Sequence, residues 1–151
     1  MTIHNSQRTM ARRLALQAIY QVDVQGEDFL MQGMDLFLSQ QSEDAQVQAA
    51  AGEYTKGTWA YRQEADQWLA VLVPRWSVAR MAVVDRSILR LAAWEITHAD
   101  TPAPVILDEA ITMARDFSTG DSAEFINGVL DAVIKDYARQ TGKASPAGPA
   151  V

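Results

Sequence analysis

The sequence predicts an all-α fold of about seven helices in a single domain. Apolar residues recur at the spacing of amphipathic helices through most of the chain. Ala, Leu, Gln, Glu and Arg are common, and the long β-branched runs that favour strands are absent. Hydrophobic residues make up 48% of the 151 residues, enough for one core, and no internal repeat of fixed period occurs.

The N-terminal region is expected to be a flexible arm over residues 1–8, followed by a helix over 9–22. Arg8, Arg12 and Arg13 lie near the start of this helix, where the positive end of the helix dipole disfavours cations. Three arginines near a terminus are most often a solvated helix start. A misplaced positive charge is also often retained for a partner, so both explanations stay open.

The middle of the chain predicts helices over 28–39, 44–60 and 62–73, and the last two could be nearly continuous. Between Leu14 and Thr55 there is no Lys or Arg, and seven acids occur. The net charge of −6 also argues against a generally basic, nucleic-acid-binding surface. Any phosphate contact in the first half is therefore expected from the N-terminal arginines.

A helix over 83–98 is expected at the centre of the fold, because it is apolar around most of its circumference. Arg86 and Arg90 are four residues apart and repel mildly, so they would be more stable beside an acidic helix or an external anion. Pro102 and Pro104 fix the next connector, and a helix over 104–117 follows.

The stretch Phe117–Asp131 reads as a helix end, a loop and the start of a helix over 122–140. Asp121 is expected at the N-cap, with an acid three residues later as in a capping box. Asn127-Gly128 costs this helix about 1 kcal/mol of propensity or more. This pair is either a tolerated weak spot or a small polar face needed for packing or binding.

The remaining features limit the possible functions. Residues 9–140 form the predicted domain, and 141–151 is a small, Pro/Gly-rich tail expected to be disordered. The chain has no cysteine and two histidines, and it lacks nucleotide-binding glycine loops, so no enzyme chemistry, metal or cofactor is predicted. No apolar run approaches a membrane span and no signal-peptide core is present, so a cytoplasmic binding protein is expected.

Four segments, in the right order and at the right spacing, resemble the NusB family of transcription antitermination factors. The similarity runs from about Arg8 to Lys135, is strongest from Val84 onward, and is weak across 25–75. The segments are ARRLALQAIYQ (11–21), VDRSILRLAAWEI (84–96), PAPVILDEAITMARDF (102–117) and GDSAEFINGVLD (120–131).

The resemblance implies a fold of two packed helical subbundles. It implies binding of the single-stranded boxA segment of ribosomal RNA leader transcripts, together with NusE, a small-subunit ribosomal protein. The resulting complex makes RNA polymerase resist termination. Some members of the family form homodimers, so a homodimer is a further expectation, and no catalysis or cofactor is implied.

The resemblance also implies the site residues. Thr9 and Met10 stand where further arginines are common in the family, so the basic arm is thin. Tyr20 is implied as a ring on which RNA bases stack, although a core-edge aromatic is the more common role of such a residue. One RNA strand is expected to span two groups of residues. The RNA-binding candidates are Arg8, Arg12, Arg13, Tyr20, Phe117, Asp121, Ser122, Phe125 and Asn127, and the NusE-binding candidates are Asp85, Arg86, Arg90 and Glu95.

Two alternatives remain open at this point. A NusB-like module also occurs in RNA methyltransferases, but there a catalytic domain follows, and this chain ends at Val151. A helical protein-interaction module without any RNA role would share the same composition and periodicity.

Overall fold

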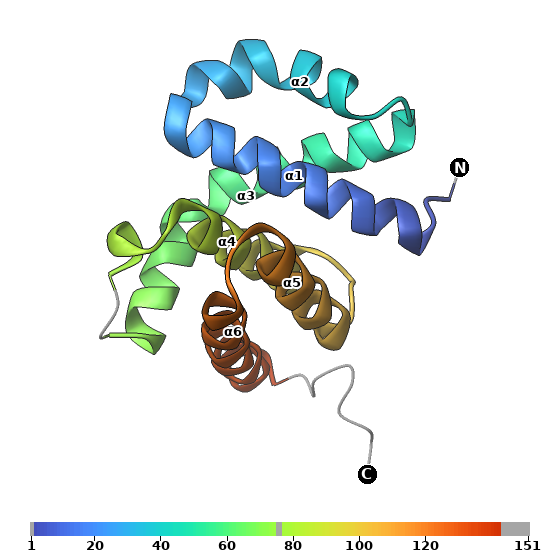
Figure 1. Cartoon of the computed structure of the whole chain (residues 1–151). Helices are drawn as coiled ribbons and strands as arrows, with labels where there is room; N and C mark the ends of the chain where they lie inside the picture. The colour runs from blue at the N-terminus through green and yellow to red at the C-terminus, as the bar shows by residue number, and fades with distance from the viewer. Residues whose placement is uncertain (1, 75–76, 143–151) are drawn as a thin grey trace. The chain divides into compact units, whose positions relative to one another are not determined.

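A computed structural model describes residues 2–74 and 77–142, and within them it contains only helices (Figure 1). The all-α prediction is confirmed. There are six α-helices instead of about seven, because the predicted helices 44–60 and 62–73 form one helix, α3. Of the expected disordered tail 141–151, Thr141 is the last residue of α6, and residues 143–151 lie outside the described part of the chain. The elements are α1 (Asn5–Gln25), a π-helical turn η1 (Phe29–Gly33), α2 (Met34–Gln41), α3 (Ala45–Leu72), a 3-10 turn η2 (Val78–Arg80), α4 (Val83–His98), α5 (Ala103–Phe117) and α6 (Gly120–Thr141).

The chain divides into two compact units, Met1–Ala60 and Tyr61–Val151, which we call unit 1 and unit 2. Unit 1 contains α1, η1, α2 and the first part of α3. Unit 2 contains the rest of α3 and the helices α4, α5 and α6. Two helical groups agree with the predicted subbundles. Among the described helices, none combines the length and hydrophobicity needed to cross a membrane.

The start of α1 is tied to the start of α3 within unit 1. The helix begins earlier than predicted, so residues 5–8 are helical and do not belong to a flexible arm. The His4 N–H donates to Gln7 Oε1 (2.8 Å), and Gln7 Nε2 donates to Asp44 Oδ2 (2.9 Å). Asp44 Oδ1 also accepts the Gln46 N–H (2.9 Å) at the first turn of α3. The bond from Gln7 is the main cause that lowers the pKa of Asp44.

A π-helical turn precedes α2 where the sequence predicts a continuous helix over 28–39. Gly33 ends this turn, and a Cβ at that position would lie 3.2 Å from Cδ1 of the Phe29 ring. The same ring packs edge-on against Phe37, with ring centroids 5.7 Å apart. Gly33 therefore lets a half-buried aromatic pair close over the turn.

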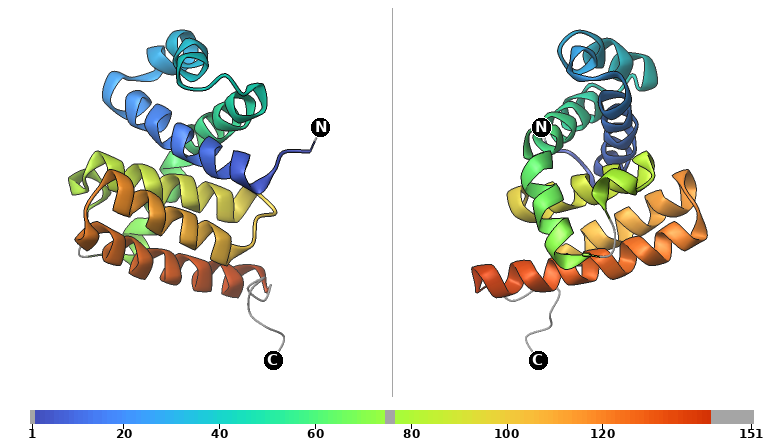
Figure 2. Two further views of the ribbon diagram at one scale, coloured as in Figure 1. Left: turned by 45° about the vertical axis from the view of Figure 1, so that its right-hand side comes forward. Right: turned by 90° about the vertical axis from the view of Figure 1, so that its left-hand side faces the viewer.

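The helices α4, α5 and α6 pack against one another in unit 2, where they lie side by side in both views of Figure 2. Every residue of α4 from Ser87 to Ile96 is buried. This confirms the expectation of a central helix, which must be apolar on several sides because it contacts neighbours on several sides.

The α5–α6 junction differs from the predicted one in its cap. Thr119, and not Asp121, is the N-cap residue of α6, and its Oγ1 accepts the Ser122 N–H (3.1 Å). Asp121 lies in the first turn, where its charge still suits the helix dipole. The Thr119 hydroxyl accepts a backbone N–H in the first turn of α6, as the Asp121 carboxylate was predicted to do. The sequence therefore contains two residues that could cap this helix.

Candidate nucleic-acid interface

The candidate residues of α1 point in two directions. An α-helix turns about 100° per residue, so residues four apart share a face and residues seven apart return to nearly the same face. Arg8 and Arg12 therefore share one face of α1. Arg13 and Tyr20 share another, about 100° further round the helix. The three arginines do not form a single basic patch.

Arg8 and Arg12 are directed at one tyrosine of α3. Arg8 Nη1 donates to the Tyr54 hydroxyl (3.0 Å), and the Arg12 guanidinium carbon lies 5.9 Å from the centre of the Tyr54 ring. Arg12 is 3% exposed and Tyr54 is 4% exposed. Arg12 is therefore an internal cation that packs α1 on α3. Its contact with RNA phosphates stays a prediction, which this burial disfavours.

The other face of α1 carries an open row of side chains, which we call the α1 stripe: Met10, Arg13, Gln17, Tyr20 and Val24. Met10 is 55% exposed, Tyr20 is 38% exposed and Val24 is 58% exposed. Arg13 and Gln17 are half-buried. An exposed ring at Tyr20 is available for stacking, so its location favours a surface role over a core-edge role.

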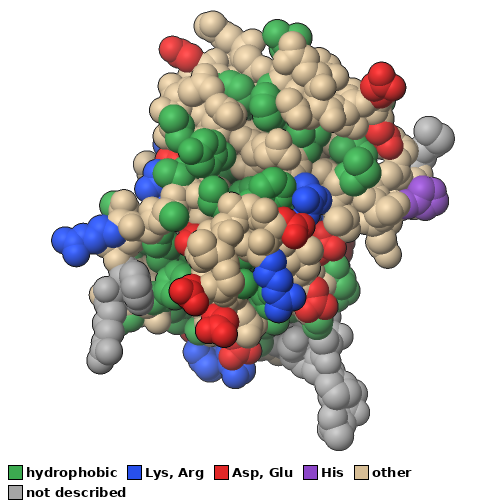
Figure 3. All heavy atoms as spheres, viewed as in Figure 1, with side chains coloured by type: hydrophobic (Ala, Val, Ile, Leu, Met, Phe, Trp, Pro, Cys, Tyr) green, Lys and Arg blue, Asp and Glu red, His purple; other side chains and the backbone are tan. Residues whose placement is uncertain are grey.

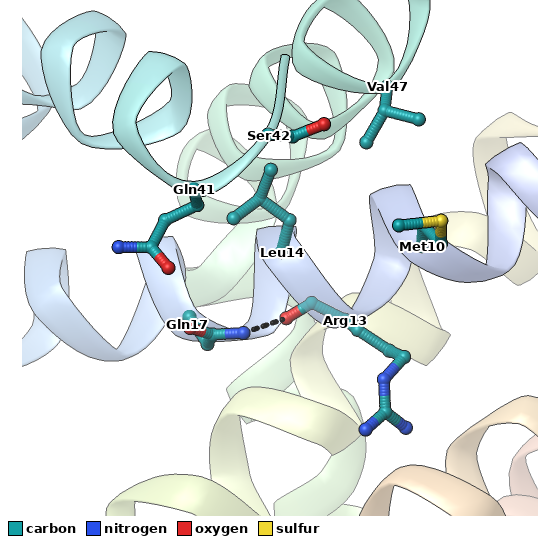
Figure 4. Close-up of a pocket in the computed structure, with 7 residues that line it drawn as sticks. All are labelled: Met10, Arg13, Leu14, Gln17, Gln41, Ser42 and Val47. Carbon is teal, nitrogen blue, oxygen red and sulfur yellow. Dashed lines mark hydrogen bonds between the residues drawn. The ribbon is translucent and has the colours of Figure 1, made fainter. Parts of the chain in front are cut away.

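A surface pocket adjoins this stripe in unit 1 (Figure 4). Its volume is about 160 Å³, and it is formed by α1, the end of α2, the connector and α3. We call it the α1 pocket; its lining residues are Met10, Arg13, Leu14, Gln17, Gln41, Ser42 and Val47.

The pocket has an apolar floor and a polar edge. Figure 4 shows Leu14 directed toward Ser42, while the Arg13 guanidinium is turned away from Gln41 and Ser42. Gln17 Nε2 donates to the Arg13 carbonyl at 3.4 Å, which is a long and weak bond. Within the described residues, the Gln41 side chain makes no hydrogen bond. Its amide therefore remains available to a ligand.

Unit 1 has few cations to offer a nucleic acid. Its basic side chains are the three arginines of α1 and Lys56 of α3. Acidic and hydrophobic side chains, but no Lys or Arg, are visible over the α2 part of the face in Figure 3. This matches the acidic first half read from the sequence, and it makes Arg13 the cation best placed beside the exposed Tyr20.

The α6 candidates do not share one face either. Asp121 and Asn127 are exposed, and Phe117, Ser122 and Phe125 are half-buried. The helical period directs Asp121, Ser122 and Asn127 to three different sides of α6. These three residues therefore do not form one polar face.

Ser122 and Ser118 both donate to Asp85, which is a candidate for NusE binding. The Ser118 hydroxyl donates to Asp85 Oδ1 (2.8 Å) and the Ser122 hydroxyl donates to Asp85 Oδ2 (2.8 Å). Asp85 lies in the first turn of α4 and is 9% exposed. Its carboxylate holds the α5–α6 junction onto α4, so its first role is inside unit 2.

The other NusE-binding candidates are also mostly internal. Arg90 donates to Asp66 of α3 through Nε (2.8 Å) and Nη2 (2.7 Å). Asp66 is therefore the acidic residue of a neighbouring helix that the charge of Arg90 was expected to need. Arg90 is 8% exposed and Glu95 is 1% exposed, whereas Arg86 is half-buried. Asp85, Arg90 and Glu95 are thus buried within the chain, and their contact with NusE stays a prediction that this burial disfavours.

The Asn127-Gly128 pair lies on the open side of α6. A Cβ added at Gly128 would meet no atom within 4 Å, so no packing contact requires a glycine there. Of the explanations for Asn127-Gly128, a tolerated weak spot in the helix and a binding role remain. The exposed Glu124 on this side repels phosphate, and the charge of Asp131 is paired with Lys135 (2.9 Å), so an RNA contact here would mainly involve bases.

Sequence reasoning missed the pocket residues Gln17, Gln41 and Ser42. Met10 and Gln17 could have been found, because they repeat at helical spacing with Arg13 and Tyr20. Gln41 and Ser42 come from the end of α2 and the following connector, and nothing local in the sequence indicates that they approach α1.

Comparison with known proteins identifies relatives over nearly the whole domain. The model of the NusB family matches residues 9–135. The transcription antitermination protein NusB of Symbiobacterium thermophilum is 38% identical over 136 residues, which cover 85% of this chain and 89% of that protein.

Solved structures agree. NusB of T. maritima superimposes with a TM-score of 0.75 at 28% identity, covering 95% of this chain and 100% of that one. The same fold, with a TM-score of 0.74 and 22% identity, occurs in a structure of the antitermination factors NusB and NusE in complex with dsRNA, covering 89% of this chain and 100% of that one.

Proposed function

The chain belongs to the NusB family of transcription antitermination proteins, and we propose that it binds a boxA-type single-stranded segment of ribosomal RNA leader transcripts together with NusE. The complex then makes RNA polymerase resistant to termination. Because the protein acts on transcription, we propose that it is cytoplasmic. No catalytic step and no cofactor take part.

The observation that carries the RNA proposal is the α1 stripe. Proteins bind single strands by stacking bases on aromatic rings beside cations that contact phosphates. Tyr20 supplies an exposed ring, and Arg13 lies two helical turns away on the same face. Arg8 is half-buried at the start of the helix, and Arg12 supports α1 from the inside.

The α6 candidates are proposed as a second RNA contact, within unit 2. Asp121 and Asn127 offer a carboxylate and an amide, which can accept hydrogen bonds from the amino groups of bases. Phe117 and Phe125 offer partly exposed rings. This contact contributes base selection and little phosphate binding, because its surroundings are acidic.

NusE is the proposed protein partner because this chain alone presents little positive charge. A solved protein of the same fold is described in complex with NusE and dsRNA, which supports NusE and RNA as partners. A basic partner would add the phosphate contacts that the thin arginine group lacks. Arg86, the half-buried member of the four candidates, is the one retained for the NusE surface.

Fluorescence anisotropy with labelled RNA tests the proposal. Single-stranded boxA RNA, its scrambled sequence and a boxA duplex are titrated with the chain, with and without NusE, across a salt series. We expect preference for single-stranded boxA, and tighter binding when NusE is present. Equal affinity for boxA and scrambled RNA under all conditions would leave a protein-interaction module without an RNA role.

A further inference from the structure

We propose that the α1 pocket holds one unstacked nucleobase of the bound RNA strand. This inference rests on the proposed function and adds a base-reading subsite to it. The pocket lies beside the α1 stripe and shares Met10, Arg13 and Gln17 with it. The pocket residues Gln41, Ser42 and Val47 are outside α1 and extend the site beyond the stripe.

The size of the pocket restricts its occupant. Sites for whole small molecules and cofactors usually measure about 300–1,000 Å³. A pocket of about 160 Å³ is too small for a nucleotide cofactor and accommodates one ring system. Since it is open on one side, the ring can remain attached to a chain that continues along the surface.

The chemistry of the lining suits a base. Leu14 is 5% exposed and Val47 is 1% exposed, and together they form an apolar floor against which a flat ring can pack. Gln17 and Gln41 each carry an amide with both donors and an acceptor, the combination that pairs with the edges of bases. Among the described residues, only the long 3.4 Å bond to the Arg13 carbonyl occupies the Gln17 amide group.

Ser42 completes the polar edge with limited capacity. Its hydroxyl accepts the Asp44 N–H (3.1 Å) and its carbonyl accepts Gln48 Nε2 (2.7 Å). These bonds fix the connector that forms one wall of the pocket. The hydroxyl still has its own proton to donate to an acceptor on a base.

The position of the pocket matches the course of a strand along α1. Tyr20 lies about one helical turn beyond Gln17 on the same face. A strand that stacks one base on Tyr20 therefore brings a neighbouring base to the pocket.

An abasic scan of boxA RNA tests the subsite. Each nucleotide is replaced in turn by an abasic residue, and affinity is measured for wild type, Gln41→Ala and Gln40→Ala. Gln40 is the matched control, since it is an exposed glutamine in the same last turn of α2 that does not line the pocket. Gln17→Leu, which keeps side-chain volume but removes the amide, is the second pocket variant.

We expect one nucleotide, beside the position stacked on Tyr20, whose base removal weakens wild-type binding by about three- to tenfold, the effect of one or two hydrogen bonds. At that nucleotide alone, Gln41→Ala and Gln17→Leu should abolish the difference between intact and abasic RNA. Gln40→Ala should behave as wild type.

Two failures can be distinguished. Wild-type protein that does not prefer boxA over scrambled RNA contradicts the proposed function, and the subsite falls with it. Wild-type protein that prefers boxA, while neither pocket variant changes the abasic profile, contradicts the base subsite alone.

Discussion

Tyr54 explains, at the scale of single residues, why three neighbouring arginines serve different purposes. Its hydroxyl accepts from Arg8, and its ring lies beside the Arg12 guanidinium. Arg13 is only one residue further along, but the turn of the helix directs it to the α1 stripe. The sequence shows the three arginines. Their different surroundings follow from the helical period of α1 and from the position of Tyr54 on α3.

Replacing Tyr54 with Phe should lower the free energy of unfolding by about 1 kcal/mol. The change removes the hydroxyl that accepts from Arg8, and it keeps the ring beside Arg12. Urea denaturation of wild type and variant measures the loss. In an Arg8→Ala background the same replacement should cost much less, and an equal loss in both backgrounds would show that the hydroxyl acts through another group.

The helices themselves were predicted with uneven success, for physical reasons. The structure places α4 at the predicted residues 83–98, and α5 begins one residue before the predicted 104–117, because the two prolines and the apolar period mark both helices locally. The earlier start of α1 has a local signal in the bond from the His4 N–H to Gln7 Oε1, whereas the bond from Gln7 to Asp44, 37 residues away in sequence, could not be found by local reasoning.

Glycines within helices provide a prediction at this scale. Gly128→Ala should stabilise the protein by about 1 kcal/mol, since α6 gains helix propensity and a methyl group meets no neighbour. Gly33→Ala is the matched comparison: its methyl group would approach the Phe29 ring, so it should give no such gain. Thermal unfolding of both variants measures this, and a loss of stability in Gly128→Ala would indicate a contact absent from α6 as described.

The contact between the end of α3 and α6 predicts acid sensitivity. Trp68 Nε1 donates to Asp136 Oδ2 (2.7 Å), and this bond is the main cause that lowers the pKa of Asp136 below its usual 3.8; Arg139 adds to it. The pKa is lower in the folded state, so the stabilisation is present above pH 3.8 and is lost as the pH falls through the folded-state pKa.

Asp136→Asn should therefore be less stable than wild type at neutral pH, and the difference should shrink as the pH falls below about 3.8. Urea denaturation between pH 2 and 7 measures this, with the exposed Glu124→Gln as a control that should follow wild type throughout. A difference between Asp136→Asn and wild type that is constant with pH would rule out the carboxylate as its source.

For the whole molecule, charge and family membership together define the proposed role. The net charge of −6 does not indicate an RNA-binding protein, and the resemblance in four segments predicted the family that the comparisons confirm. The candidate residues of the proposed RNA and NusE sites were predicted in the same way. Their directions were not, since burial of Arg12 and the internal bonds of Asp85 and Arg90 depend on helices distant in sequence.

The central claim is that the α1 stripe binds boxA RNA, and the most direct test is the salt dependence of boxA affinity for Tyr20→Ala and Arg13→Ala. Tyr20→Ala should weaken binding by about 1–3 kcal/mol, the value of one stacked base. Arg13→Ala should lower the slope of log affinity against log salt by about 0.7, the value of one phosphate contact. The exposed Arg80→Ala is the control and should match wild type. Wild-type affinity and slope in both stripe variants would contradict the claim.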